Sequence, residues 1–266
     1  MSAPLLPNAK VNSLEFFHIN WNVWKMLGLQ IFKRDVHTLQ RLAVSRAYFA
    51  WSIAANFMGT ILFPIHLAMG IYESRNKSEL FNSISISITS IGATIKFFLM
   101  ASKMKQIAQM EALTQVLDAR VTHPEELWHY QNRIRLNIFN IQRMFSILYS
   151  GVAASVAALY LSSGERRLIY PGWLPFEWRQ SSGFYALAIL YQLFGFIFQI
   201  SQTYTNDSFA PKSLCLLSAH IELLYKRVSR IGFEGPNEDG GGSKAALQQE
   251  EDKLNLCVLD QINLYE

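Results

Sequence analysis

The sequence predicts an all-α membrane protein, a helical bundle with four transmembrane helices and a cytoplasmic amino terminus. Half of the 266 residues are hydrophobic and only 17% are charged, whereas soluble domains carry about 25% charged residues. Four stretches are almost free of charge and are long enough to cross the hydrocarbon, which takes ~20 residues. The positive charges gather in the segments on one side of these stretches.

The four predicted spans cover residues 47–72, 81–102, 144–164 and 180–206. The first, third and fourth contain no Asp, Glu, Lys or Arg, and the second contains Lys96 as its one charged residue. A charge inside a membrane is a candidate functional group. Lys96 lies in the inner third of its span, however, and can extend its ammonium to the inner headgroups. Both interpretations stay open, and the sequence favours the second.

Lysine and arginine are distributed unevenly between the two sides of the predicted bundle. Segments 1–46, 103–143 and 207–266 hold eighteen of the 24 Lys and Arg residues, whereas loops 73–80 and 165–179 hold five. Cytoplasmic segments carry the excess of positive charge in membrane proteins. We therefore expect the amino terminus and the tail to be cytoplasmic and the two loops to be extracellular.

The segments outside the spans contain local signals. In the amino-terminal segment, Trp21 to Leu29 mixes aromatic residues with a cation, which predicts an interfacial helix on the inner leaflet. Thr122 with Glu125 three residues later matches a capping box, so a helix beginning there is expected to continue into the third span. The glycine-rich segment 232–243 predicts a flexible linker. It separates two predicted cytoplasmic helices, at residues 214–231 and 244–265.

The second extracellular loop is rich in proline and aromatic residues and predicts a structured lid over the bundle. Proline cannot continue either flanking helix, and aromatic rings suit the edge of a bilayer. The expected lid residues are Tyr170, Trp173, Pro175, Phe176 and Trp178. In the first loop, Asn76 begins an Asn-Lys-Ser glycosylation motif on the predicted outer side.

Uncharged polar groups and aromatic rings in the spans suggest a ligand site. Small residues at helical spacing on the second span are typical of close helix packing, and the alternative is the wall of a pocket. A cavity with apolar walls and a few hydroxyls suits small, volatile, mostly apolar ligands. The candidate ligand-binding residues are Ser83, Ser87, Tyr160, Phe184, Tyr185 and Gln192.

The sequence gives no support for an enzyme. It lacks a phosphate-binding glycine loop, HExxH and CxxC, so we expect no catalytic residue, metal or cofactor. His66 follows Pro64 inside the first span, which favours structural hydrogen bonding over a metal site or a proton relay. Membrane lipid is the expected surrounding partner, and nucleic acid is not expected.

Several short segments occur along the chain in an order and spacing that agree with the topology predicted from charge. These segments are Trp21 to Leu29, Leu62-Phe63-Pro64-Ile65, Tyr170 to Trp178, Asn206-Asp207-Ser208 followed by His220, Leu223-Leu224 and Arg227–Ile231, and Leu256-Cys257 with Asp260-Gln261. By their order and spacing, the chain resembles an insect odorant receptor of the fly type.

The resemblance implies more than the residue patterns show. Such receptors have seven helices, an inside amino terminus and a pore lined by the seventh helix. They form tetrameric ligand-gated cation channels, usually with a shared co-receptor, and bind an odorant in the outer part of the bundle. By this resemblance, we expect an odorant receptor subunit in the plasma membrane of olfactory sensory neurons.

Only four of the seven expected helices are recognisable before Glu266. We therefore expect this chain to lack the pore helix and to form no pore alone, as an incomplete gene model or a truncated isoform. The alternative is a four-span membrane interaction or modulatory protein without channel activity. A conventional G-protein-coupled receptor would need an outside amino terminus, which the charge distribution opposes.

Overall fold

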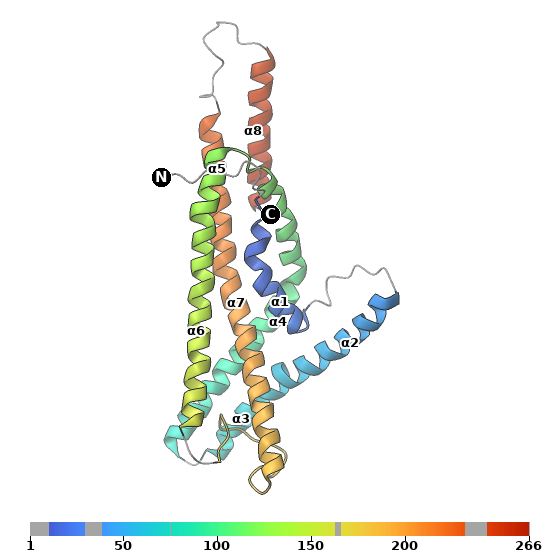
Figure 1. The fold of residues 1–266 in the computed structure, drawn as a ribbon, viewed down its shortest axis with the longest axis vertical. Coiled ribbons are helices and arrows are strands. Elements are labelled where there is room, and N and C mark those ends of the chain that lie inside the picture. Colours follow the sequence, from blue (N-terminus) through green and yellow to red (C-terminus); the bar gives the residue numbers. More distant parts are fainter. Residues whose placement is uncertain (1–10, 30–38, 75, 163–165, 232–243, 266) are drawn as a thin grey trace. The chain divides into compact units, whose positions relative to one another are not determined.

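The computed structural model describes residues 11–29, 39–74, 76–162, 166–231 and 244–265. The regular secondary structure of these parts is helical, and they contain no strand. Four of the helices are long and apolar enough to cross a membrane, which confirms the predicted all-α membrane fold (Figure 1). They are Arg46–Glu73, Lys77–Ala119, Pro124–Leu161 and Ser182–Arg230. The predicted linker 232–243 lies outside the described residues.

The chain divides into two compact units. We call the first the span unit, which consists of His18–Ile107 and Arg143–Phe209. The second, the tail unit, consists of Met1–Phe17, Ala108–Gln142 and Ala210–Glu266. The elements in chain order are η1 (Ser13–Phe17), α1 (His18–Met26), α2 (Leu39–Asn56), the π-helix η3 (Phe57–Leu62), α3 (Phe63–Glu73), α4 (Lys77–Ala119), α5 (Pro124–His129), the π-helix η4 (Tyr130–Ile134), α6 (Arg135–Leu161), α7 (Ser182–Arg230) and α8 (Lys244–Tyr265).

Two helices continue far beyond the spans that hydropathy delimits. Helix α4 has 43 residues and α7 has 49, including the interior Pro211. The helix expected at 214–231 is therefore the last part of α7, not a separate element. A charged residue ends an apolar stretch but not a helix, because Lys, Glu and Arg are good helix formers.

The start of the third long helix corrects a sequence prediction. The N-cap is His123, whose Nδ1 accepts a hydrogen bond from the Glu125 backbone N–H at 3.3 Å. Thr122 was expected in this role. Pro124 occupies the first helical position, where its fixed φ and missing donor are tolerated. The helix then continues to Leu161 through η4, as the sequence predicts.

In the span unit, α2 caps the carboxyl end of α1. The last carbonyls of a helix have no partner within it, and Gly28 ends this one with φ +86°. Side chains on one face of α2 donate to four successive carbonyls. These bonds join Tyr48 to Lys25 at 2.8 Å, Trp51 to Met26 at 3.0 Å, Asn56 to Leu27 at 2.9 Å and Ser52 to Gly28 at 2.8 Å.

The aromatic segment around α1 packs against protein as well. Trp24 and Leu27 are both completely buried, and the Trp24 ring lies 5.0 Å from that of Phe209. Asn20 donates to the Thr205 carbonyl at 2.9 Å. These contacts attach α1 to α2 and α7. The position at the inner leaflet that the sequence predicts stays a prediction.

The interior of the span unit contains uncharged polar side chains that bond between helices. Gln202 donates to the Thr60 hydroxyl at 2.7 Å, and that hydroxyl donates to Asn56 at 3.1 Å. Thr94 of α4 donates to the Thr60 carbonyl at 3.2 Å. Thr60 lies in η3, and π-helical turns are rare and leave backbone carbonyls open to such partners.

Lys96 has a counter-ion that sequence reasoning did not identify. Its ammonium lies 2.9 Å from Asp207 of α7, and the Tyr149 hydroxyl donates to the same carboxylate at 2.8 Å. The ion pair is partly exposed, since the side chains of Lys96 and Asp207 are 55% and 28% accessible. The charge of Lys96 is therefore paired by the Asp207 carboxylate of α7, without extension of its ammonium to the headgroups.

In the tail unit, the short amino-terminal helix η1 bonds to α4. The Ser13 backbone N–H and hydroxyl donate to the two oxygens of Asp118 at 2.6 and 2.7 Å. The same hydroxyl lies 2.7 Å from the Tyr130 hydroxyl, and His220 Nε2 lies 3.4 Å from Asp118. Asp118 thus joins η1, α4 and α7 at a buried position.

Replacing Gly28 by alanine is expected to destabilise the span unit. A Cβ there would meet Ser52 Oγ at 2.5 Å and would require an L-residue at φ +86°, which costs about 1–3 kcal/mol. Thermal unfolding of the purified chain in nanodiscs measures this. Gly151→Ala is the matched control, because its Cβ meets nothing within 4 Å. Equal unfolding temperatures for the two variants would contradict the capping role of Gly28.

Candidate functional site

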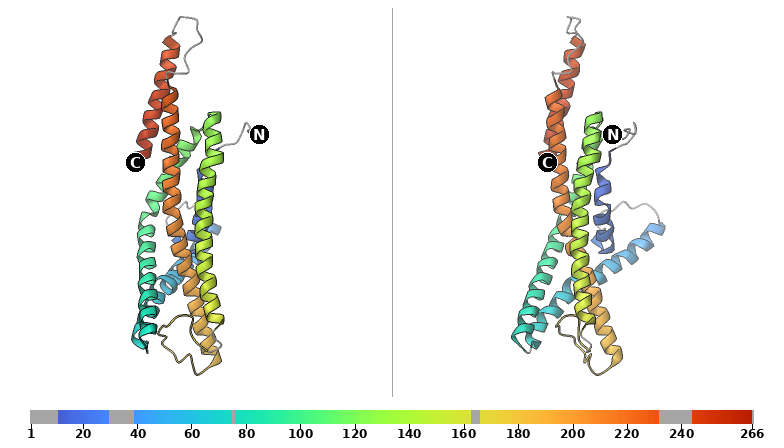
Figure 2. Two further views of the ribbon diagram at one scale, coloured as in Figure 1. Left: turned by 90° about the vertical axis from the view of Figure 1, so that its left-hand side faces the viewer. Right: turned by 60° about the vertical axis from the view of Figure 1, so that its left-hand side comes forward.

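The candidate site lies in the span unit, where the loop between α6 and α7 packs against α3 and α7 (Figures 1 and 2). This loop contains the lid predicted from the sequence, and Pro171 and Pro175 lie in its irregular part. Its backbone bonds to the helices as well: the Trp173 N–H donates to the carbonyl of His66 on α3 at 3.1 Å.

The amide of Gln192 on α7 is the main attachment of the lid. Its Oε1 accepts from the backbone N–H groups of Ile169 and Tyr170 at 2.8 and 3.2 Å. Its Nε2 donates to the Tyr170 carbonyl and to His66 Nε2, both at 2.8 Å. The side chain is completely buried. All of its hydrogen-bonding capacity is used, so Gln192 holds the lid in this structure and offers no free group to a ligand.

The partners of Gln192 also determine the tautomer of His66. Two backbone donors face Oε1, which fixes the amide orientation and leaves Nε2 as a donor. His66 Nε2 must then accept, so the imidazole is neutral with its proton on Nδ1. That proton is donated to the Trp173 carbonyl at 2.5 Å. The structural hydrogen bonding that the sequence favoured for His66 is present, and its partner is the lid.

The lid approaches α3 closely because it presents Gly172. A Cβ on Gly172 would lie 2.4 Å from His66 Nε2. The residue is buried, and any side chain there would separate the imidazole from the amide of Gln192. The backbone of the lid can therefore reach the polar groups of α3 and α7 directly.

Beside this attachment, aromatic rings of the lid pack on the first turns of α7. The ring centroids of Phe176 and Phe184 are 5.6 Å apart, and those of Trp178 and Tyr185 are 6.1 Å apart. The hydroxyls of Tyr185 and Tyr160 of α6 lie 2.9 Å apart. We call these five residues the aromatic cluster. It brings together three of the six ligand-binding residues predicted from the sequence, Tyr160, Phe184 and Tyr185.

The hydrogen-bonding groups that the cluster offers to a ligand are neutral hydroxyls. The Tyr185 hydroxyl can also donate to the Arg167 carbonyl, at 3.2 Å. In the lid, burial raises the pKa of Tyr170 to about 12, so its phenol is neutral. The guanidinium of Arg166 lies 5.9 Å from the centre of the Tyr185 ring. The arrangement offers apolar ring surface with a small number of neutral donors and acceptors.

Ser83 and Ser87 form hydrogen bonds with residues outside this cluster. The Ser83 hydroxyl lies 3.1 Å from that of Ser74, at the end of α3. Ser87 donates to the Ser83 carbonyl at 2.7 Å. Both are buried. The sequence favoured close helix packing over a pocket wall for these two residues, and that interpretation stays a prediction.

Asn76 has a structural role at the start of α4. Its Oδ1 accepts from the Glu79 backbone N–H at 2.8 Å, as an N-cap does, and the Leu80 N–H donates to its carbonyl at 3.0 Å. The cap uses the oxygen of the side-chain amide. The nitrogen, which glycosylation would modify, is not needed for the cap.

Sequence reasoning did not identify the lid attachment. Gln192 was selected as a possible ligand contact, and His66 only as a structural residue within its own helix. Their separation of 126 positions leaves no local pattern that joins them. The available signal is chemical: a buried histidine and a glutamine in apolar spans each require a partner.

The chain was compared with protein families and with characterised proteins. Residues 76–266 match the family model described as 7tm Odorant receptor. The chain is 31% identical to Odorant receptor 59a of Drosophila melanogaster over 98% of its own length and 61% of the relative. It is 30% identical to Odorant receptor 2a over 94% and 62%, and 28% identical to Odorant receptor 23a over 95% and 61%.

The matched lengths and the fold agree with one another. The chain spans about three fifths of the length of these Drosophila relatives. The family match includes α4, α6, α7, α8 and the lid. The described residues contribute four helices long and apolar enough to cross a membrane. The chain belongs to the 7tm Odorant receptor family.

Proposed function

We propose that this chain is an odorant receptor polypeptide that binds small volatile molecules at the aromatic cluster. The observation that supports this most directly is the pair of neutral hydroxyls of Tyr160 and Tyr185, 2.9 Å apart among aromatic rings. An uncharged ligand with an apolar body and one oxygen matches such a site. Membership in the 7tm Odorant receptor family supports the same class of ligand.

The proposed binding mode follows from the bonding of the two phenols. A ligand oxygen can replace Tyr185 as the partner of the Tyr160 hydroxyl, and the Tyr185 hydroxyl then donates to the Arg167 carbonyl, so neither hydroxyl is left unpaired. The apolar part of the ligand then lies against Phe176 and Phe184, and Phe184 is half exposed in the present structure. We propose that Trp178 and the lid cover the remaining face.

We propose that the lid is a constant wall of this site, with Gln192 as a positioning residue. Movement of the lid away from α7 would leave the amide of Gln192 and the imidazole of His66 without partners. Buried polar groups that lose their partners cost roughly 1–3 kcal/mol each. Ligand entry is then expected through the exposed side of the aromatic cluster, without release of the lid.

The wider activity is proposed from the family. We propose that the receptor acts as a subunit of a ligand-gated cation channel in the plasma membrane of olfactory sensory neurons. The expected partner is an odorant receptor co-receptor. In this proposal, the amino terminus and tail are cytoplasmic, the lid is extracellular, and the four spans described here supply the ligand-binding part.

Replacing Tyr185 by phenylalanine is expected to weaken binding of oxygenated ligands selectively. One neutral hydrogen bond contributes about 0.5–1.5 kcal/mol, so hexanol should bind roughly two- to tenfold more weakly, while hexane is unaffected. Quenching of tryptophan fluorescence measures both affinities, because Trp178 lies beside Tyr185. Tyr225→Phe, on an exposed part of α7, is the control. Equal loss for hexane and hexanol would place the ligand elsewhere.

Replacing Gln192 by leucine is expected to loosen the lid. The change removes the two hydrogen bonds that the amide accepts and the two that it donates. Amide hydrogen exchange should accelerate at Ile169, Tyr170 and Trp173, by at least about tenfold for the loss of one or two bonds. Gln180→Leu, at an exposed position of the same loop, should leave exchange unchanged. The attachment is refuted if the two variants exchange alike.

The proposed topology predicts which epitope tags antibodies can reach. A tag at the amino terminus should stain only after cells are permeabilised, because the Lys and Arg excess retains that end in the cytoplasm. A tag inserted beside Trp173 in the lid should stain in intact cells. Staining of the amino-terminal tag in intact cells would reverse the orientation and remove the lid from the ligand side.

A further inference from the structure

Two arginines of the loop between α6 and α7 lie beside the aromatic cluster, and the proposed binding mode does not use their guanidiniums. Arg166 donates to the Ser182 hydroxyl at 3.1 Å, and the centre of its guanidinium lies 5.9 Å from the centre of the Tyr185 ring. The guanidinium of Arg167 donates to the Leu159 carbonyl near the end of α6. All of these residues belong to the span unit, so their contacts lie within one compact part of the chain.

The positive charges of this loop exceed its negative ones. Residues 166–181 include Arg166, Arg167 and Arg179 as positive charges and Glu177 as the negative one. The contacts of Arg166 and Arg167 are with a hydroxyl, an aromatic ring and a carbonyl. Among the described residues, no carboxylate pairs with either guanidinium. Both cations therefore lie beside the cluster without a counter-ion from these parts of the chain.

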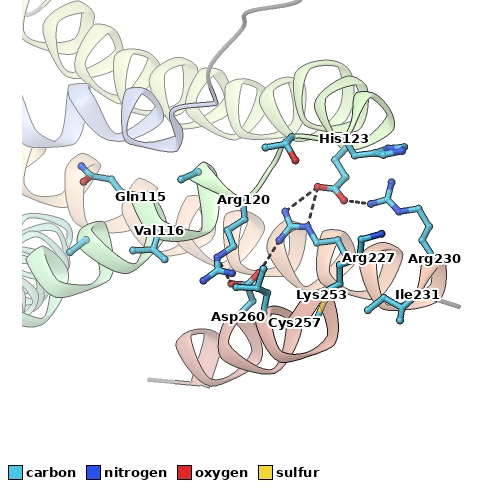
Figure 3. A pocket seen from close by; sticks show the side chains of 15 residues that line it. Gln115, Val116, Arg120, His123, Arg227, Arg230, Ile231, Lys253, Cys257 and Asp260 are labelled. Carbon is cyan, nitrogen blue, oxygen red and sulfur yellow. Dashed lines mark hydrogen bonds and ion pairs between the residues drawn. The ribbon is translucent and has the colours of Figure 1, made fainter. Parts of the chain in front are cut away.

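Arginines of the tail unit show the opposite arrangement. Arg227 contacts Glu126 at 3.0 Å and Asp260 at 2.9 Å, and Arg230 pairs with the same glutamate (Figure 3). Both carboxylates are buried, and a buried charge requires a partner within the protein. The two arginines beside the aromatic cluster are exposed, so water solvates them and an anionic ligand can take the position of the counter-ion.

Both guanidiniums retain donors for such an anion. Arg166 and Arg167 each use Nη2 in the bond to the protein. A guanidinium has five N–H groups in a planar fork, which is more than this one bond requires. The fork fits the two oxygens of a carboxylate, and charge-assisted bonds of this kind are stronger than neutral ones. The remaining N–H groups are accessible because both side chains are exposed.

The two arginines adjoin the tyrosines that hold the ligand oxygen in the proposed binding mode. A cation within about 6 Å of a ring centre is attracted to the ring, which positions the guanidinium of Arg166 at Tyr185. The Tyr185 hydroxyl donates to the Arg167 carbonyl at 3.2 Å, and the charge of Arg167 acts on the Tyr160 hydroxyl. Two phenol hydroxyls and two guanidiniums thus meet at the outer end of the aromatic cluster.

We propose that the aromatic cluster selects carboxylic acids among oxygenated ligands and binds them as carboxylates. This inference rests on the proposed function, because it names a ligand class for the same site. The hydroxyls alone suit an uncharged oxygen, and the guanidiniums extend the match to an anion. Carboxyl groups have pKa values near about 4, so such ligands are ionised in neutral solution. One carboxylate oxygen accepts from Tyr160, Arg166 offsets the charge, and the alkyl chain lies against Phe176 and Phe184.

The test compares hexanoate, its neutral methyl ester and hexanol on the full chain in phosphatidylcholine nanodiscs, by quenching of tryptophan fluorescence. Hexanoate should bind roughly three- to tenfold more tightly than methyl hexanoate, because only the anion forms charge-assisted bonds. This advantage should shrink as sodium chloride is added, since salt screens exposed charges. Arg166→Gln should reduce the ratio of hexanoate affinity to hexanol affinity by about the same three- to tenfold factor.

Lys77→Gln is the matched control, since it removes a positive charge from the exposed start of α4. It should leave the ratio of the two affinities unchanged. If hexanol binds and Tyr185→Phe weakens it, but Arg166→Gln and Lys77→Gln change the ratio alike, the proposed function stands and the preference for carboxylates is overturned. The same holds if hexanoate binds no more tightly than its ester. Absence of binding by both hexanol and hexanoate overturns the two proposals together.

Discussion

The side-chain amide of Gln192 is the contact on which the candidate ligand site depends. It is completely buried and joins the lid to α7 directly and to α3 through His66. In an apolar environment an amide cannot exchange these partners for water, so the bonds must be formed together or not at all. The position of the lid, the tautomer of His66 and the placement of Trp178 over α7 all follow from this constraint.

The same requirement explains other parts of the span unit. The carbonyls that end α1 are paired by side chains of α2, and Gln202, Thr60 and Thr94 bond across three elements. These groups are neutral, as is expected where solvation of charge is weakest. Lys96 and Asp207 form an ion pair between α4 and α7, and both remain partly exposed. Polar satisfaction, in addition to apolar packing, thus determines which helices meet.

In the tail unit, charged groups form the buried polar contacts between elements. Asp118, Glu126 and Asp260 are almost completely buried, and each contacts basic groups from other elements. The aromatic cluster and the tail unit therefore differ in electrostatics: one offers neutral hydroxyls among aromatic rings, and the other contains buried carboxylates paired with arginines.

The sequence by itself determined the helical membrane class, the four apolar stretches and the resemblance to odorant receptors, because composition and hydropathy are local properties of the chain. It also identified the lid and the tyrosines of the aromatic cluster as residue types. Only the tertiary structure decided that α4 and α7 continue past their charged residues, and that His123 replaces Thr122 as the cap. It alone paired His66 with Gln192 and Lys96 with Asp207, across 126 and 111 positions. Each buried polar group requires a partner, but which partner it finds depends on how distant helices pack.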